Sequence, residues 1–255
     1  MTLPVSRLPV GWMPSADTLK DRVVLVTGAY GGLGAAVSRA AARAGATVVI
    51  AGRRKRQLEQ LYDAMLAEGL SEPVIHPLDM EAATPRDYEA LAEGLDRDFG
   101  RLDGIVHAAA SFAGLTPIAA HKPDDWLRAM HVNVSAPFAL TQACMPLLTK
   151  ADDSSVLFVL DNPELLERAH WGAYGVSKAA LERFAAILHQ ETDNTSLRVH
   201  ALLPAPMRTA LRRQAYFGED IMQRPLPDAA AAAAVYLLSA QSAEARGAML
   251  DLRSL

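Results

Sequence analysis

VVLVTGAYGGLGAAVSRAAARAGATVVIAGRR, residues 23–54, is the stretch of sequence that decides the fold. Its β-branched apolar run at 23–26 predicts a buried strand, and a glycine-rich turn follows directly. The alanine-rich stretch at 35–44 predicts a helix that Gly45 terminates. The run TVVI at 47–50 predicts a second strand buried on both faces, so the stretch forms a parallel βαβ unit.

The alternation of strand and helix continues along the chain. Further helices are expected at 55–68, 85–99, 171–191 and 228–239, with two more inside 123–150 that are separated near Pro137. Further strands are expected at 74–77, 104–107, 156–160, 198–203 and 248–252. This order predicts a sheet of about seven parallel strands with helices on both faces, which is the doubly wound α/β architecture of the Rossmann fold.

The domain organisation follows from the same pattern. Residues 21–255 are expected to form a single dinucleotide-binding domain, and residues 1–20, interrupted by prolines, are expected to be an irregular lead-in. The segment 205–227 shows no clear periodicity. Because loops after the carboxyl ends of parallel strands surround the ligand crevice, we expect this segment to cover the substrate.

Composition excludes several classes of function. The chain of 255 residues is 51% hydrophobic, and its 25 Lys and Arg against 29 Asp and Glu give a net charge of -4. The chain therefore lacks the excess of basic residues that binding to the phosphate backbone of a nucleic acid requires. No apolar run suits a signal peptide or a membrane span, and the spacing of His, Cys and Asp suits no metal site. The single cysteine, Cys144, fits a core thiol in a reducing cytoplasm.

The glycine-rich turn after the first strand indicates a dinucleotide site. Gly28 permits the tight turn, Gly32 lets the backbone approach a pyrophosphate, and Gly34 allows the helix to pack closely on the sheet. The phosphates then lie on the helix N-terminus, where backbone N–H groups are free. The intervening residues Tyr30, Gly31 and Leu33 are expected to line the same cofactor site.

The end of the second strand predicts which dinucleotide is bound. An acidic side chain there would bind the 2′-hydroxyl of NAD, but the sequence has Arg53 and Arg54. A guanidinium grips a 2′-phosphate through a fork of donors, so NADP(H) is expected to be preferred, with NAD(H) possible. The alternative is that both arginines belong to a solvated basic turn.

Two motifs carry a family resemblance. The chain has Thr-Gly-x-x-x-Gly-x-Gly at 27–34 and Tyr-x-x-x-Lys at 174–178. Over 21–252 it resembles the short-chain dehydrogenase/reductase family, and within that family the bacterial YciK-type branch. The resemblance implies an NAD(P)-dependent oxidoreductase that acts on a small carbonyl or alcohol, with Tyr174 as general acid and base.

The resemblance also implies further site residues. Lys178, one helical turn from Tyr174, would stabilise the phenolate and bind the nicotinamide ribose, and Asn133 would support a proton-relay water. Asp79 would face the adenine. The positions that contact the rest of the cofactor in the family are Ala108, Ala109, Ala110, Pro204 and Thr209, although Ala108 to Ala110 differ from the family's usual Asn-Ala-Gly.

One departure affects the expected chemistry. The family serine lies 13 residues before the tyrosine, where this chain has Asp161. A serine hydroxyl donates to a substrate oxygen, whereas a carboxylate only accepts and raises the pKa of a nearby tyrosine. Two alternatives stay open: Asp161 donates when protonated, or the loop is shifted by one residue and the Asn162 amide donates.

Two functions are therefore compatible with the sequence. The first is an NADP(H)-dependent oxidoreductase; the second is a dinucleotide-binding or sensing protein that has lost its chemistry at position 161. A homodimer or homotetramer is expected in either case. It would form through an apolar face of the Tyr174 helix (Leu181, Phe184 and Leu188) and through the apolar helix at 138–148.

Overall fold

The strand that precedes the glycine turn packs against helices on both of its sides. Val24 and Val26 of β2 (Val23–Thr27) contribute to one hydrophobic cluster, and Val23 and Leu25 contribute to a second one. Successive side chains of a strand point to opposite faces, so a strand that is apolar at every position needs a covering layer on each side. The run of β-branched residues thus explains the layers of the fold.

The computed structural model describes residues 3–253, and this part of the chain contains one parallel sheet of eight strands in the order β1-β8-β7-β6-β5-β2-β3-β4. Besides β2, its strands are β1 (Val5–Ser6), β3 (Thr47–Gly52), β4 (Val74–Pro77), β5 (Gly104–His107), β6 (Ser154–Val159), β7 (Leu197–Leu203) and β8 (Met249–Asp251). The predicted doubly wound α/β fold is confirmed.

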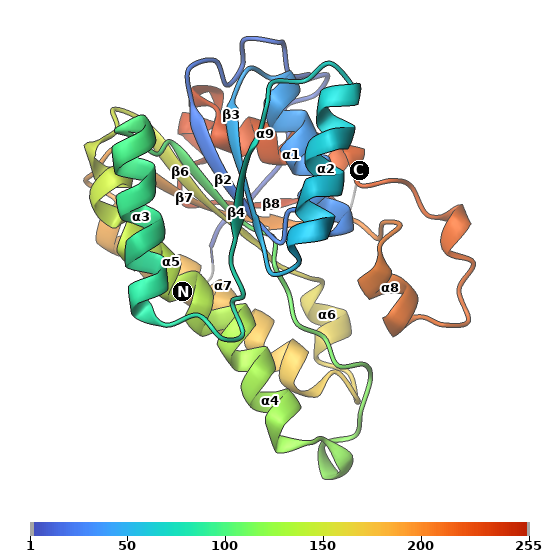
Figure 1. Ribbon diagram of the computed structural model, residues 1–255. Helices are drawn as coiled ribbons and strands as arrows, with labels where there is room; N and C mark the ends of the chain where they lie inside the picture. The colour runs from blue at the N-terminus through green and yellow to red at the C-terminus, as the bar shows by residue number, and fades with distance from the viewer. Residues whose placement is uncertain (1–2, 254–255) are drawn as a thin grey trace.

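Helices form a layer on each face of this sheet, as Figure 1 shows. One layer consists of α1 (Gly32–Arg43), α2 (Lys55–Ala67) and α9 (Asp228–Leu238). The other consists of α3 (Pro85–Phe99), α5 (Ala136–Lys150) and α7 (Gly172–Thr192). The shorter helices α4 (Pro123–Met130), α6 (Pro163–Leu166) and α8 (Ala210–Ala215) lie near the carboxyl ends of the strands.

The N-terminal segment differs from the expected irregular lead-in. Val5 and Ser6 pair in parallel with Met249 and Leu250 of β8 and add an eighth strand to the sheet. Leu3 and Leu19 are buried in the two clusters, so the segment contributes to the core. A strand of two residues is too short for a period to show in the sequence.

The two helices expected in 123–150, separated near Pro137, are joined by a π-helical turn that precedes this proline. The helix α4 ends at Met130, a π-helical turn spans His131–Ser135, and α5 begins at Ala136. The backbone keeps helical dihedrals at Met130, His131, Ser135 and Ala136, so Pro137 lies just after a π-helical turn inside one helical run, and a local change of helix type accommodates its missing N–H.

The predicted apolar face of α7 needs a similar correction. Leu181 and Leu188 are 2% and 5% exposed, because they face the sheet. The apolar side chains that α7 exposes are Val176 and Ile187, and α5 exposes Phe138. Phe138 packs edge-on against Phe184 of α7, with ring centroids 5.9 Å apart. An apolar surface does exist here: Phe138 and Phe184 belong to it as expected, whereas Leu181 and Leu188 do not, and Val176 and Ile187 take part instead.

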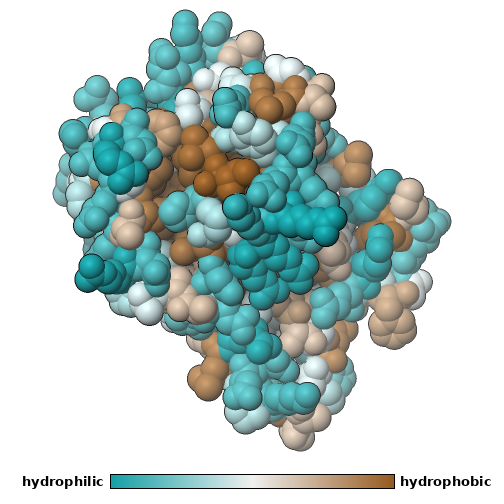
Figure 2. Space-filling view, viewed as in Figure 1, coloured by the Kyte–Doolittle hydropathy of each residue, from teal (hydrophilic) through white to brown (hydrophobic). Residues whose placement is uncertain are grey.

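The segment 205–227 projects beside the strand ends, at the right of Figure 1. Its α8 helix and the turn after it are tied together by Glu219, which pairs with both Arg212 and Arg224. Phe217 and Met222 are largely exposed, and Figure 2 shows apolar and polar surface side by side on this projection. The segment has the position expected of a substrate-covering loop.

Two further features agree with the sequence. Cys144 is buried in α5, and its burial raises the pKa of its thiol to about 12, as expected of a core thiol. In residues 3–253 no helix is both long enough and apolar enough to cross a membrane.

Two buried histidines predict a loss of stability in mild acid. Burial lowers the pKa of His107 in β5 and of His200 in β7 to about 3, so the folded protein keeps both neutral while the unfolded chain protonates them near pH 6.5. Stability is therefore complete above the unfolded pKa and falls as the pH decreases below it. Each histidine is expected to lower the free energy of unfolding by about 2 kcal/mol at about pH 5, relative to its value above about pH 6.5. Urea unfolding measures this loss. In His107→Asn the loss between about pH 7 and pH 5 should be smaller by about that amount, and an unchanged loss would contradict the assignment.

Candidate active site

A cleft of about 710 Å³ opens at the carboxyl ends of the strands, between the ends of β2 and β5. In an open parallel sheet this switch point is where ligands bind. The residues predicted to bind the cofactor all line this cleft: Gly28, Tyr30, Gly31, Gly32, Leu33, Gly34, Arg53, Arg54, Asp79, Ala108, Ala109, Ala110, Tyr174, Lys178, Pro204 and Thr209. Asp161 lines it as well, whereas Asn133 does not.

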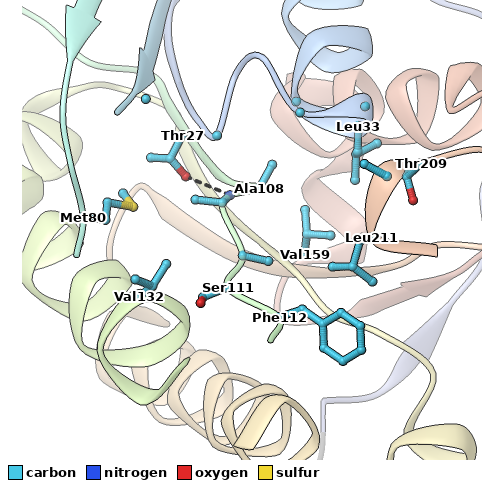
Figure 3. Close-up of a pocket in the computed structure, with 18 of the residues that line it drawn as sticks. Thr27, Leu33, Met80, Ala108, Ser111, Phe112, Val132, Val159, Thr209 and Leu211 are labelled. Atoms are coloured by element: carbon cyan, nitrogen blue, oxygen red, sulfur yellow. Dashed lines mark hydrogen bonds between the residues drawn. The ribbon is translucent and has the colours of Figure 1, made fainter. Parts of the chain in front are cut away.

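The turn after β2 approaches the end of β5 too closely for any side chain at Gly28. Gly28 has φ +62°, and a Cβ there would lie 2.7 Å from the Cα of Ala109. The Ala109 amide donates to Oγ1 of Thr27 at 3.3 Å, shown as the dashed line in Figure 3. A Cβ on Gly34 would collide with the carbonyl oxygen of Gly28. The glycines therefore set the path of the backbone into α1.

The beginning of α1 suits an anion. No side chain caps this helix, and its first turn contains no acidic residue. The first backbone N–H groups of a helix have no partner within the helix, and the helix dipole favours negative charge there. A pyrophosphate fits this position.

Apolar side chains, together with Thr209, form two opposite walls of the cleft. In Figure 3, Met80 and Val132 lie on one side, and Leu33, Thr209 and Leu211 lie on the other. Thr209 Oγ1 accepts from the Arg212 amide at 3.2 Å and so caps α8. Walls of this kind suit flat rings, such as the two bases of a dinucleotide.

Charged residues gather where β3 ends. Arg53 Nη1 lies 3.3 Å from Oε2 of Glu81, and Arg128 Nε of α4 donates to Oε1 of the same carboxylate at 2.6 Å. Glu81 is fixed further by its own amide, which donates to Asp79 Oδ1 at 3.0 Å. Arg54 lines the cleft from the N-cap position of α2. Two guanidiniums therefore share one carboxylate at this end of the cleft.

The catalytic candidates meet at the other end. Tyr174 Oη donates to Asp161 Oδ2 at 2.9 Å. Lys178 Nζ donates to the carbonyl oxygen of Val159 at 2.8 Å and lies 5.7 Å from the centroid of the Tyr174 ring. Because α7 carries Tyr174 and Lys178 one turn apart, both point to the end of β6, where Asp161 follows.

The surroundings keep Tyr174 protonated. Burial, the charge of Asp161 and the hydrogen bond to Asp161 together raise the pKa of Tyr174 well above its usual value. Burial lowers the pKa of Lys178 to about 8, against the opposing effect of Asp161. The Tyr174 hydroxyl is thus a proton donor across the neutral pH range, and its phenolate is disfavoured.

The two asparagines considered from the sequence have other partners. Asn133 is fully buried: its amide donates to the Ser111 carbonyl at 3.0 Å and to Ser177 Oγ at 2.9 Å, and its oxygen accepts from the Ser111 amide. It therefore joins the loop after β5 to α7. Asn162 Oδ1 caps α6 and accepts from Arg253 at 2.7 Å, outside the cleft lining. Asn162 therefore does not face the cleft, and Asp161 lines it but accepts a hydrogen bond from Tyr174.

Several cleft residues were not predicted. Glu81 and Arg128 are 47 positions apart in the sequence, and neither belongs to a motif. Ser111 and Phe112 lie in the loop after β5, and Leu211 lies in the short helix α8 after β7, where the sequence shows no clear periodicity. The only signal for them was their position after the carboxyl end of a strand.

Comparison with known sequences decides the family. The sequence model of the short chain dehydrogenase family matches residues 22–219, which is most of the chain. This chain belongs to the short-chain dehydrogenase family. The resemblance seen in the glycine turn and the Tyr-x-x-x-Lys motif is thereby confirmed, and the family makes the chain an NAD(P)-dependent oxidoreductase.

Individual relatives support the same assignment. The uncharacterized oxidoreductase YciK of Escherichia coli K12 is 37% identical over 216 residues, which cover 85% of each protein. A short chain dehydrogenase of Escherichia coli CFT073, solved as a complex with NADPH, is 36% identical with a TM-score of 0.89 over 93% of this chain and 99% of that one. A short chain dehydrogenase of Shigella flexneri, complexed with NADP, is 34% identical with the same TM-score and the same coverage.

Proposed function

We propose that this short-chain dehydrogenase is an NADP(H)-dependent oxidoreductase that acts on a small carbonyl or alcohol, with Tyr174 as general acid and base. The observation that carries the proposal is the arrangement of one cleft: two guanidiniums at one end, an uncapped helix N-terminus in the middle, and Tyr174 with Lys178 at the other end. This order matches the order of phosphate, pyrophosphate and nicotinamide in NADP(H).

The residues of the cleft fit the cofactor. Arg53 would bind the 2′-phosphate, the first amides of α1 would bind the pyrophosphate, and Lys178 would bind the nicotinamide ribose. Asp79 and Met80 would contact the adenine, with Ala108 to Ala110, Pro204 and Thr209 around the rest. When bound, NADP(H) supplies or accepts the hydride. The relatives complexed with NADP and NADPH support this assignment.

The protein moves the proton. Tyr174 is protonated at neutral pH, so in a reduction it would have a proton to donate to the developing alkoxide, although its raised pKa makes it a weaker acid than an ordinary tyrosine. For alcohol oxidation the phenolate of Tyr174 would be the base, and the raised pKa keeps its population low at neutral pH. Asn133 joins the loop after β5 to α7 and so positions the helix that carries Tyr174.

A second candidate function rests on Asp161. Its carboxylate replaces a hydroxyl donor and engages Tyr174, which would suit a binding or sensing protein without turnover. Direct titration with NADPH followed by a screen of aldehydes and ketones separates the two. NADPH consumption that depends on Tyr174 supports the oxidoreductase, and tight NADPH binding without turnover of any substrate class supports the sensor.

Arg53→Ala is expected to weaken NADPH binding by about tenfold to a hundredfold and to leave NADH binding nearly unchanged, because a charge-assisted bond to the 2′-phosphate is lost. Arg56→Ala is the matched control, since Arg56 belongs to the same basic stretch but lies outside the cleft lining. Fluorescence titration measures both affinities. Equal affinities for NADPH and NADH in the unchanged protein would contradict the proposed binding of the 2′-phosphate by Arg53.

We propose that two copies of the chain pair through the exposed apolar side chains of α5 and α7, Phe138, Val176 and Ile187. Light scattering at micromolar concentration should then give the mass of a dimer or tetramer. Ile187→Asp should shift the mass towards the monomer, because it places a charge in the apolar surface. A monomeric mass for the unchanged protein would rule the pairing out.

The cytoplasmic location stays a prediction.

A further inference from the structure

The carboxylate of Asp161 is arranged to accept hydrogen bonds where the family's serine donates one. Its Oδ2 accepts from the Tyr174 hydroxyl at 2.9 Å, and its Oδ1 accepts from the Asn162 amide at 2.7 Å. The arginines on neighbouring segments have other carboxylate partners: Arg212 pairs with Glu219, and Arg253 pairs with Asp251. Among the described residues, the hydrogen-bond donors to Asp161 are therefore a hydroxyl and an amide, both neutral. The nearby cation is Lys178, whose pKa the charge of Asp161 raises against burial and whose Nζ donates to the Val159 carbonyl oxygen.

An aromatic wall faces the same part of the cleft. It consists of Phe112, Trp171 and Tyr174, whose ring centroids lie 5.2 to 5.9 Å apart. Phe112 and Tyr174 line the cleft, and Figure 3 shows Phe112 at its end, next to Ser111. Aromatic faces attract cations, and a nearby carboxylate adds to that attraction. The two features share Tyr174, and both the carboxylate of Asp161 and the rings of Phe112 and Trp171 favour positive charge.

We propose that this site reduces a C=N group in its cationic, iminium form rather than a neutral carbonyl. The proposal rests on the proposed function, because it requires NADP(H) in the cleft. An iminium N–H, or the cationic charge of an N-substituted iminium, would lie against Asp161, and the rings that flank the C=N group would pack on the aromatic wall. A neutral carbonyl oxygen would instead meet a carboxylate, which cannot donate to it.

The reaction balances without a proton donor. A hydride from NADPH forms a C–H bond at the iminium carbon, and the π electrons of the C=N bond move to nitrogen. The cation becomes a neutral amine, and NADP⁺ is the oxidised product. Reduction of a carbonyl needs a proton from Tyr174 in addition, but an iminium already carries its positive charge at the start. The firm Tyr174 to Asp161 hydrogen bond therefore does not obstruct this reaction.

Binding tests the proposal without turnover. N-methylisoquinolinium and isoquinoline share one ring shape, but only the first is cationic at neutral to slightly basic pH. With NADP⁺ present, calorimetry should show that the cation binds at least about tenfold more tightly than the neutral compound. Asp161→Asn should remove most of that difference. Glu164→Gln is the matched control, because it removes the same charge from an exposed side chain three residues away.

Turnover provides the second measurement. The unchanged protein should consume NADPH faster with N-methyl dihydroisoquinolinium than with α-tetralone, and Asp161→Asn and Asp161→Ser should both reverse this order. Equal binding of cation and neutral compound, or faster reduction of the ketone by the unchanged protein, would overturn the inference and leave the proposed function standing. Binding of the cation without NADPH consumption by either compound would overturn the proposed function, and the iminium reduction with it.

Discussion

Asp161→Ser is expected to raise the rate of carbonyl reduction by on the order of 10², because it restores one donor aimed at the developing oxyanion. In the present structure the Tyr174 hydroxyl donates to Asp161. Removal of the carboxylate also frees the Tyr174 proton for the substrate. NADPH consumption with aldehydes and ketones at saturating cofactor measures the gain.

Two controls make this result specific. Tyr174→Phe in the Asp161→Ser background should abolish the gain, since the proton donor is then missing. Asn162→Ala should have little effect on the rate, because Asn162 caps α6 and accepts from Arg253 outside the cleft. Fast carbonyl reduction by the unchanged protein, together with a much lower rate in Asn162→Ala, would show that Asn162 is the donor. Asp161 would then not occupy the position of the family's serine.

Tyr174→Phe in the otherwise unchanged protein is expected to reduce carbonyl turnover by about 10² to 10⁴, the usual contribution of a general acid. Phenylalanine retains the packing on Phe112 and Trp171, so the affinity for NADPH should stay within about twofold. Tyr216→Phe is the control: its ring packs against Trp171 but lies outside the cleft lining. Unchanged carbonyl turnover in Tyr174→Phe would show that Tyr174 is not the general acid.

Local patterns in the sequence predicted most of this fold. The strands and helices around the glycine turn were expected because apolar periodicity and glycine positions depend on nearby residues alone. The strand β1 was missed because two residues carry no period. Leu181 and Leu188 were expected on an outer face, and the structure places them on the sheet, because an alanine-rich helix offers little contrast between its faces.

The site divides in the same way. The Tyr174, Lys178 and Asp161 arrangement was expected from fixed spacings, and the structure brings the three together. The cluster of Arg53, Glu81 and Arg128 was not expected, because it forms only where the end of β4 approaches α4 in space. Contacts between residues far apart in sequence depend on the packed fold, and one sequence alone does not reveal them.

A crystal structure of this protein with NADP⁺ tests the central claim most directly. We expect the 2′-phosphate to lie between the guanidiniums of Arg53 and Arg128, where it takes the place that Glu81 holds now, with the pyrophosphate on the first turn of α1. The nicotinamide ring should lie beside Tyr174 and Asp161. A nicotinamide far from Tyr174, or a 2′-phosphate in solvent with the Arg53 to Glu81 pair intact, would contradict the account.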